Sequence, residues 1–240
     1  MAMRAVLVGL AAFGLWGCVP AGPVLQQPDS GLPVAPAQPM LPAEVAAENF
    51  VAVVDRVEPV AEDYCRRLGR VGTCDFQIVI DNRPGQPPNA YQTLDKDGRP
   101  ILAFTVPLIR DARNRDELAF VMGHEAAHHI AGHIPRQQST AAAGAILAGV
   151  LAQVGGMGEQ AIATAQDLGA TVGARRFSKE FELEADGLGA EIAYTSGFDP
   201  VLGAAFFDRL PDPGDQFLGT HPANADRKRV VAATVARMGG

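Results

Sequence analysis

The spacing of apolar residues predicts a long amphipathic helix at the start of the folded part of the chain. Phe50, Val53 and Val57 follow one another at intervals of three and four residues, which places them on one face of a helix over residues 43–67. Pro59 weakens the second half of this prediction, because a proline inside a helix removes a backbone hydrogen bond.

Three short segments that follow predict a small sheet. The β-branched run at 76–80 is typical of a strand. The segments 90–94 and 100–106 flank the turn-forming sequence at 95–98, and this arrangement is typical of a hairpin. We therefore expect a small antiparallel sheet early in the domain.

Helical periodicity returns in the second half of the chain. Asn114 and Glu117 form a candidate capping box at the start of an apolar run. We expect this helix to continue to about His133 and to be stopped by Pro135. A further helix is expected over 178–195.

Residues 140–158 are rich in alanine and glycine. Their apolar core, 141–152, is shorter than the roughly 20 residues that a membrane-spanning helix needs. We expect a buried helix or a helical hairpin here. The alternative is a surface helix that contacts a membrane or covers a cleft.

Together these elements indicate one α+β domain over residues 43–240, mostly helical and with a small sheet. The formal net charge is −7, and Lys and Arg are not clustered. Nucleic acid is therefore not an expected partner, because phosphate binding needs grouped positive charges.

The first 17 residues have the layout of a secretory signal, in which Arg4 precedes the apolar run 5–16. The sequence around Cys18 resembles a bacterial lipobox, where the chain is cut before the cysteine and a lipid is attached to its sulfur. An ordinary cleaved signal with an incidental cysteine is the alternative. The proline-rich residues 18–42 predict an extended tether.

We therefore expect a periplasmic protein that is anchored to a membrane by its lipid. Val19 after the lipidated cysteine favours the outer membrane, by resemblance to other lipoproteins. In an exported domain, Cys65 and Cys74 are expected to form a disulfide. Two free buried thiols are the alternative.

The sequence His124-Glu125-Ala126-Ala127-His128 carries the sharpest chemical signal. Histidines four residues apart on a helix lie on one face and can bind one metal ion together, while Glu125 can reach a metal-bound water. Zinc suits such a site, because it accepts neutral imidazole and lowers the pKa of its water to about 7. A polar helix face with incidental histidines is the alternative.

A catalytic zinc ion needs a third protein ligand and an open position. His133 follows His128 by five residues, so we expect it to point elsewhere, on the surface or at the helix end. Glu182 and Asp186 share one face of the later helix. Glu182 would bind the metal, and Asp186 would accept the N–H of a ligand histidine. A solvated acidic face, as expected for Glu184, is the alternative, and spacing alone leaves the choice open.

The HExxH sequence followed downstream by ExxxD resembles the gluzincin metallopeptidases of the CAAX prenyl endopeptidase and HtpX type. The likeness is closest to their periplasmic LoiP- and BepA-like branch, and it is strong over 177–189. The resemblance implies a zincin-like fold in which His124, His128 and Glu182 hold one zinc ion per chain. It also implies that Glu125 is the general base.

A later element, Thr220-His221-Pro222 with Arg227 five residues after the proline, also resembles this family. The resemblance implies that His221 is either a fourth ligand that holds the enzyme shut or a hydrogen-bond donor to the transition state. Arg227 and Asp186 would be supporting residues. The alternative is that His221 has no catalytic role and simply lies at a turn beside a helix N-terminus.

These observations predict a zinc metalloendopeptidase of the bacterial cell envelope that cleaves misfolded or unassembled proteins. The strand at 101–105, with Phe104 within it, would bind extended substrate by strand addition. One alternative is a lipid-anchored assembly factor or chaperone with a latent zinc site, which the presence of Glu125 disfavours. A structural zinc site is another, but such sites favour four Cys and His ligands.

Overall fold

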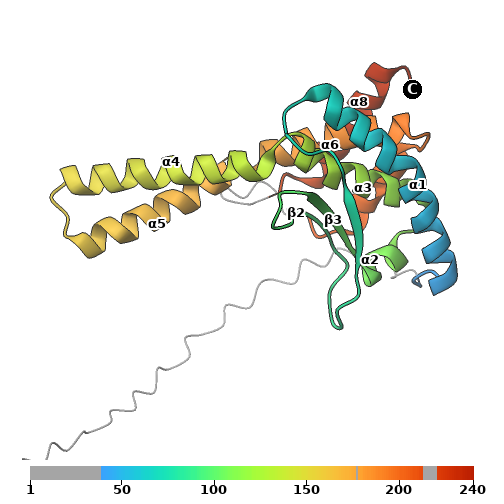
Figure 1. The fold of residues 1–240 in the computed structure, drawn as a ribbon, viewed down its shortest axis with the longest axis horizontal. Helices are drawn as coiled ribbons and strands as arrows, with labels where there is room; N and C mark the ends of the chain where they lie inside the picture. Colours follow the sequence, from blue (N-terminus) through green and yellow to red (C-terminus); the bar gives the residue numbers. More distant parts are fainter. Residues whose placement is uncertain (1–38, 177, 213–220) are drawn as a thin grey trace, which may run out of the picture. The chain divides into compact units, whose positions relative to one another are not determined.

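The computed structural model describes residues 39–176, 178–212 and 221–240 (Figure 1). The predicted signal segment, Cys18 and most of the predicted tether lie outside the described residues. In chain order the elements are α1 (Ala43–Leu68), β1 (Gln77–Asp81), β2 (Ala90–Leu94), β3 (Pro100–Thr105), α2 (Val106–Asp111), α3 (Arg115–Ile130), α4 (His133–Val154), α5 (Glu159–Arg176), α6 (Ser178–Thr195), α7 (Pro200–Gly203), the 3-10 helix η1 (Ala204–Arg209) and α8 (Asn224–Met238).

The first helix, α1, forms as predicted and continues through Pro59. Phe50 and Val53 lie on its buried face, within the main hydrophobic core. A disulfide joins Cys65, near the end of α1, to Cys74, which precedes β1, with 5.6 Å between their Cα atoms. The cross-link therefore holds the C-terminal end of α1 beside the start of the sheet.

The mostly helical α+β class is confirmed, but the sheet is mixed rather than antiparallel. Its strand order is β1-β3-β2. β2 and β3 form the predicted antiparallel hairpin, whereas β1 pairs with β3 in parallel. β3 is the most deeply buried strand of the three and takes the central position, paired on both sides. β1 therefore does not pair with β2, the next strand in sequence, but with the second strand of the hairpin, and it runs in the same direction as that strand.

The third helix, α3, begins after Asn114, whose side chain caps it, as predicted. It ends at Ile130, earlier than predicted. Gly132 adopts the left-handed conformation (φ 67°), and α4 starts directly at His133. Pro135 therefore does not stop α3 but lies in the first turn of α4, where its missing N–H leaves no helical hydrogen bond unmade.

Helices α3 and α6 pack closely where Gly123 meets Gly189. A Cβ atom on Gly123 would lie only 2.6 Å from the Gly189 carbonyl oxygen, and one on Gly189 would lie 2.6 Å from the backbone nitrogen of His124. Side chains larger than hydrogen would push the two backbones apart. This contact brings the HExxH sequence on α3 next to the acidic residues of α6.

Helices α4 and α5 form an antiparallel hairpin that extends away from the other helices of the compact unit Pro39–Gly240 (Figure 1). Of the two forms expected for residues 140–158, the structure shows the hairpin. Among the described helices, none is both long enough and apolar enough to cross a bilayer.

Candidate metal centre

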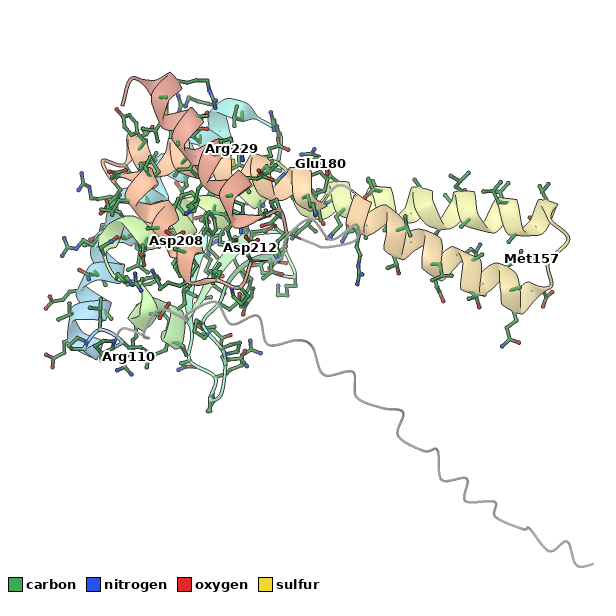
Figure 2. All side chains as sticks on the ribbon, turned by 180° about the vertical axis from the view of Figure 1, so that it is seen from behind. Arg110, Met157, Glu180, Asp208, Asp212 and Arg229 are labelled. Carbon is green, nitrogen blue, oxygen red and sulfur yellow. A yellow bond between two sulfur atoms is a disulfide. The ribbon has the colours of Figure 1, made fainter. Side chains whose placement is uncertain are left out.

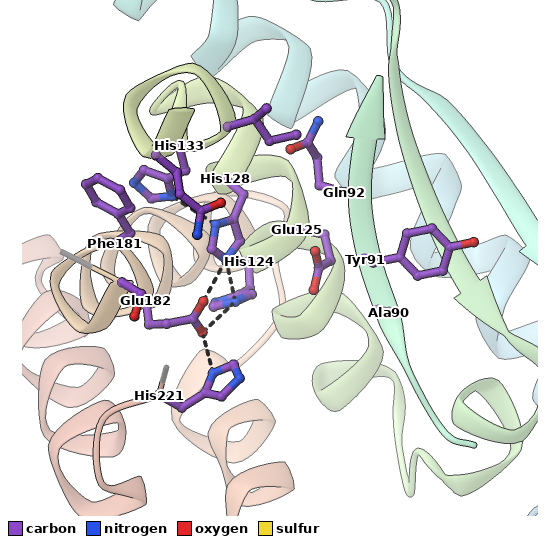
Figure 3. Close-up of a pocket in the computed structure, with 13 residues that line it drawn as sticks. Ala90, Tyr91, Gln92, His124, Glu125, His128, His133, Phe181, Glu182 and His221 are labelled. Carbon is purple, nitrogen blue, oxygen red and sulfur yellow. Dashed lines mark hydrogen bonds and ion pairs between the residues drawn. The ribbon is translucent and has the colours of Figure 1, made fainter. Parts of the chain in front are cut away.

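Two histidines of α3 and one glutamate of α6 meet at the junction of these helices (Figure 3). The Nε2 atoms of His124 and His128 are 3.0 Å apart. Glu182 Oε2 lies 3.6 Å from Nε2 of His124, and Glu182 Oε1 lies 3.4 Å from Nε2 of His128. The three residues thus point one nitrogen or oxygen atom each toward a common point.

This donor set fits a zinc ion. Tetrahedral zinc with bonds of about 2.0–2.1 Å separates its ligand atoms by about 3.3 Å, close to the separations found here. Among the described residues, these three form a group that could hold a metal ion. Burial, together with the neighbouring His124, lowers the pKa of His128 to about 3, so its imidazole is neutral and able to bind a metal.

Behind the histidines, Asp186 and Arg227 form a buried pair. Asp186 Oδ1 lies 2.9 Å from Nδ1 of His124. Arg227 donates two hydrogen bonds of 2.7 Å to the same carboxylate, and its Nη2 also lies 3.3 Å from Glu182 Oε2. Burial opposes ionisation of Asp186, but the hydrogen bonds from His124 and Arg227 prevail and lower its pKa. The structure therefore brings both supporting residues expected from the sequence to the cluster.

His133 lies against His128, and the prediction that it points elsewhere is wrong. Its Nδ1 is 2.9 Å from Nδ1 of His128, and its side chain is buried. The prediction assumed one continuous helix, in which a spacing of five residues separates two side chains. Because the helix breaks at Gly132, the chain turns and carries His133 back toward α3.

Glu184 is also not the solvated side chain expected from the sequence. Its carboxylate lies 3.3 Å from Nε2 of His133 and accepts hydrogen bonds from Arg70 (2.8 Å) and Arg136 (2.7 Å). It therefore links α6 to the first turn of α4 and to the segment after α1. The sequence gives no sign of these partners, since they come from two segments that are distant from α6 along the chain.

Glu125 stands on the opposite side of the cluster, facing β2 (Figure 3). Burial raises the pKa of its carboxyl to about 7, and a hydrogen bond from the Gln92 backbone works in the opposite direction. A carboxylate with a pKa close to neutrality can both accept and return a proton. Its position one residue after His124 places it beside the metal cluster but outside it.

Two adjoining cavities, of about 290 and 180 Å³, open over the cluster. Both are lined by Glu125 and by Ala90, so they form one cleft that follows residues 88–92 along β2. The prediction that the strand at 101–105 binds substrate is wrong, because this segment belongs to β3, which is paired on both sides. β2 borders the cleft instead, and no strand of the described residues pairs with its outer edge.

His221 reaches the cluster from the segment before α8. Its Nδ1 lies 3.2 Å from Glu182 Oε2, on the side away from His128, and its side chain is 56% exposed. Burial raises the pKa of Glu182, but the hydrogen bond from His221 and the nearby charges of the site outweigh burial and lower this pKa to about 2. His221 thus contacts a candidate ligand at the mouth of the cleft.

Comparisons with known proteins match most of the folded chain. The pattern described as peptidase family M48 matches residues 53–235. Over 140 residues the chain is 30% identical to the mitochondrial metalloendopeptidase OMA1 of Arabidopsis thaliana, a match that covers 55% of this chain and 27% of the relative. Over 136 residues it is 32% identical to the beta-barrel assembly-enhancing protease of Escherichia coli strain K12, covering 50% and 27%.

A third relative matches over more of its own length. The chain is 25% identical over 188 residues to the metalloprotease LoiP of Escherichia coli strain K12, a match that covers 73% of this chain and 72% of the relative. By contrast, the chain matches only about a quarter of the length of the other two relatives, each covered over 27%.

Proposed function

This chain belongs to peptidase family M48 and is a metalloprotease, and from that premise we propose that it is a zinc-dependent endopeptidase of the bacterial cell envelope. One zinc ion per chain would be held by His124, His128 and Glu182. The observation that carries the proposal is the convergence of three donor atoms beside Glu125, at the floor of a cleft bordered by the outer edge of β2.

When bound, zinc supplies Lewis-acid chemistry: it polarises the scissile carbonyl and lowers the pKa of the attacking water. Glu125 acts as the general base, taking a proton from that water on its carboxylate and passing it to the leaving amine. Asp186 accepts the Nδ1–H of His124 and so keeps its Nε2 free to bind the metal. Arg227 keeps the Asp186 carboxylate charged and in place.

The cleft suits an extended polypeptide. Residues 88–92 run along it, and the Gln92 backbone amide points toward Glu125 rather than toward β3. Substrate would add to β2 as an antiparallel or parallel strand, which selects for unfolded or unassembled protein. The relative named a beta-barrel assembly-enhancing protease supports a role with envelope proteins.

Strand addition can be tested at Ala90. Amides two residues apart in a strand point the same way, so the Ala90 amide faces the cleft like that of Gln92. Ala90→Pro is expected to lower kcat/KM for an unfolded protein at least about tenfold while zinc content stays at the native level. Unchanged turnover in the folded variant would show that substrate does not bind by strand addition to β2.

Location in the envelope rests on the sequence of the first 42 residues. A lipid on Cys18 and a tether up to α1 would hold the domain at the periplasmic face of the outer membrane. In a bacterial host, mass spectrometry of the mature chain should find a diacylglyceryl group on Cys18. Recovery of the chain unmodified, or the same membrane association in Cys18→Ser, would contradict the anchor.

The metal requirement is tested by removal and return of zinc. The purified protein is expected to cleave unfolded casein, to stop when a chelator removes its metal, and to recover with about one equivalent of zinc. Cleavage that survives chelation would contradict the zinc mechanism. If the zinc-loaded protein binds casein without cleaving it, the result would favour an assembly factor or chaperone over a peptidase.

A further inference from the structure

The hairpin of α4 and α5 is held together by small residues. A Cβ atom on Gly144 would lie 2.1 Å from the Gly169 carbonyl oxygen, and one on Gly173 would lie 2.2 Å from the Thr140 carbonyl oxygen. The two backbones therefore touch directly along the hairpin. Larger side chains are excluded at these glycines.

The large apolar side chains of the hairpin point outward instead. Along α4 and its turn they are 50–83% exposed, and two more on α5 are 49–62% exposed (Figure 2). They are Ile146, Leu147, Val150, Leu151, Val154, Met157, Leu168 and Val172. Small residues inside and large apolar residues outside is the reverse of a water-soluble helix pair and is typical of helices that contact lipid.

The two helices of the hairpin differ in their content of charged and polar residues. No Asp, Glu, Lys or Arg occurs between Gln137 and Gly158, which includes nearly all of α4. On α5, by contrast, exposed polar residues recur at helical spacing and form one stripe: Gln160, Thr164, Asp167, Thr171 and Arg175. The hairpin thus has an apolar helix and a helix with a polar side.

We propose that the outer face of α4 docks onto a lipid bilayer, with the hairpin lying in the plane of the headgroups and the polar stripe of α5 directed toward water. Such a two-sided helix pair suits the membrane interface. The exposed face over residues 142–154 is about 20 Å long at the rise of an α-helix. Because Lys and Arg are absent from Gln137 to Ala174, apolar burial rather than attraction to anionic lipid drives the contact.

A bilayer is a better occupant than a protein for this face. The outer side of α4 offers no charge and, over residues 141–152, no polar side chain to pair with a partner. The length of chain before the compact unit also fits: residues 18–39 can extend about 70 Å, twice the length of α4 at about 33 Å. A lipid on Cys18 and the hairpin could therefore meet the same membrane.

Docking of α4 would also set the position of the cleft. The first turn of α4 carries His133, which contacts the metal cluster, and residues Ile134 and Gln137 line the cleft. The cleft would then open close to the membrane surface. Substrates would be proteins that have reached that surface without being assembled.

The first test measures vesicle binding without the anchor. Residues 18–240 with Cys18→Ser keep the whole compact unit Pro39–Gly240. We expect this protein to float with pure phosphatidylcholine vesicles, and adding anionic lipid should not strengthen binding. Leu147→Gln combined with Leu151→Gln should lower the partition coefficient about tenfold or more. Val51→Gln combined with Leu202→Gln, at apolar residues of similar exposure outside the hairpin, should leave it unchanged.

The second test gives the orientation and does not depend on loss of binding. The only tryptophan of the chain, Trp16, precedes residue 18, so a single introduced tryptophan reports its own surroundings. In vesicles of brominated phosphatidylcholine, Leu151→Trp should be quenched strongly and Thr164→Trp, on the polar stripe, only weakly.

Absence of vesicle binding, equal loss in the control variant, or equal quenching at both positions would overturn the proposal. So would dimerisation or casein capture that depends on Leu147 and Leu151 while vesicles are not bound. None of these outcomes depends on peptidase activity or on the lipid at Cys18.

Discussion

At the residue scale, the two ring nitrogens of His128 have different partners, and this difference determines where its proton lies. Nε2 faces His124 and Glu182, while Nδ1 lies 2.9 Å from Nδ1 of His133. Two facing nitrogens need one proton between them. If Nε2 of His128 binds a metal, its Nδ1 carries that proton, and His133 accepts it and donates its own Nε2–H to Glu184.

Removal of the His133 side chain, the hydrogen-bond partner of His128, should weaken metal binding. His133→Ala is expected to raise the zinc dissociation constant by about ten- to a hundredfold, whereas His133→Asn, whose amide oxygen can accept the same proton, should restore most of the affinity. Competition with a chelating dye measures both. His129→Asn is the matched control, because His129 is also buried but bonds to the Thr73 carbonyl instead. Equal loss in all three variants would mean a purely structural role.

The sequence predicted the residues whose roles depend on one helix and missed those that depend on a turn. His124, Glu125 and His128 share a helix, so their spacing alone predicted their proximity. His133 depends on the left-handed conformation of Gly132, which moves it from its position on a continued helix. A glycine three residues before a proline is the signal that could have indicated this break.

At the scale of elements, the site depends on how closely α3 and α6 approach. Gly189 lies against the backbone of His124, so the distance between the two helices determines whether Glu182 reaches the histidines. The sequence predicted both helices, and α6 to the residue at each end. It could not predict the distance between them. A glycine inside a helix can mark a close contact between two helices, but it can also be a tolerated residue that only weakens the helix.

Gly189→Ala should therefore separate the ligands. A Cβ atom 2.6 Å from a backbone nitrogen forces α6 to move, with a stability loss of about 1–3 kcal/mol and a clear loss of zinc affinity. Gly187→Ala on the same helix is the control, since its Cβ would meet its nearest atom at 3.5 Å. Urea unfolding and zinc titration of both variants measure the difference. Similar results for the two would contradict the importance of the contact.

The link from α6 to α4 through Glu184 predicts a pH dependence. Partial burial raises the pKa of Glu184, but hydrogen bonds from Arg136, His133 and Arg70 outweigh this effect. Together they lower the pKa of Glu184 from its ordinary value of 4.5 to about 2. The folded state thus binds this proton more weakly than the unfolded state does. The stabilisation is complete above about pH 4.5 and is lost as the pH falls toward 2.

Denaturant unfolding of the metal-free protein measures this effect. The free energy of unfolding of the native chain minus that of Glu184→Gln should be constant above about pH 5 and should shrink as the pH falls through 4.5. A difference that does not change with pH over this range would show that the carboxylate is not held in its charged form.

At the scale of the whole molecule, a helical scaffold places one cleft beside the edge of a small sheet. The fold class followed from the sequence, since helical periodicity dominates the chain. The parallel pairing of β1 with β3 did not, because the strand patterns alone do not show which strand of the hairpin β1 pairs with. That pairing matters for function, since it leaves β2 rather than β3 at the edge beside Glu125.

In the proposed mechanism, this cleft hydrolyses peptide bonds with Glu125 as the base. The most direct measurement compares casein hydrolysis by the native protein and by Glu125→Gln, with the zinc content of both determined in the same samples. We expect equal zinc in the two proteins and a rate that is lower by about a hundredfold to ten-thousandfold in the variant. Equal hydrolysis by two zinc-loaded proteins would contradict this mechanism.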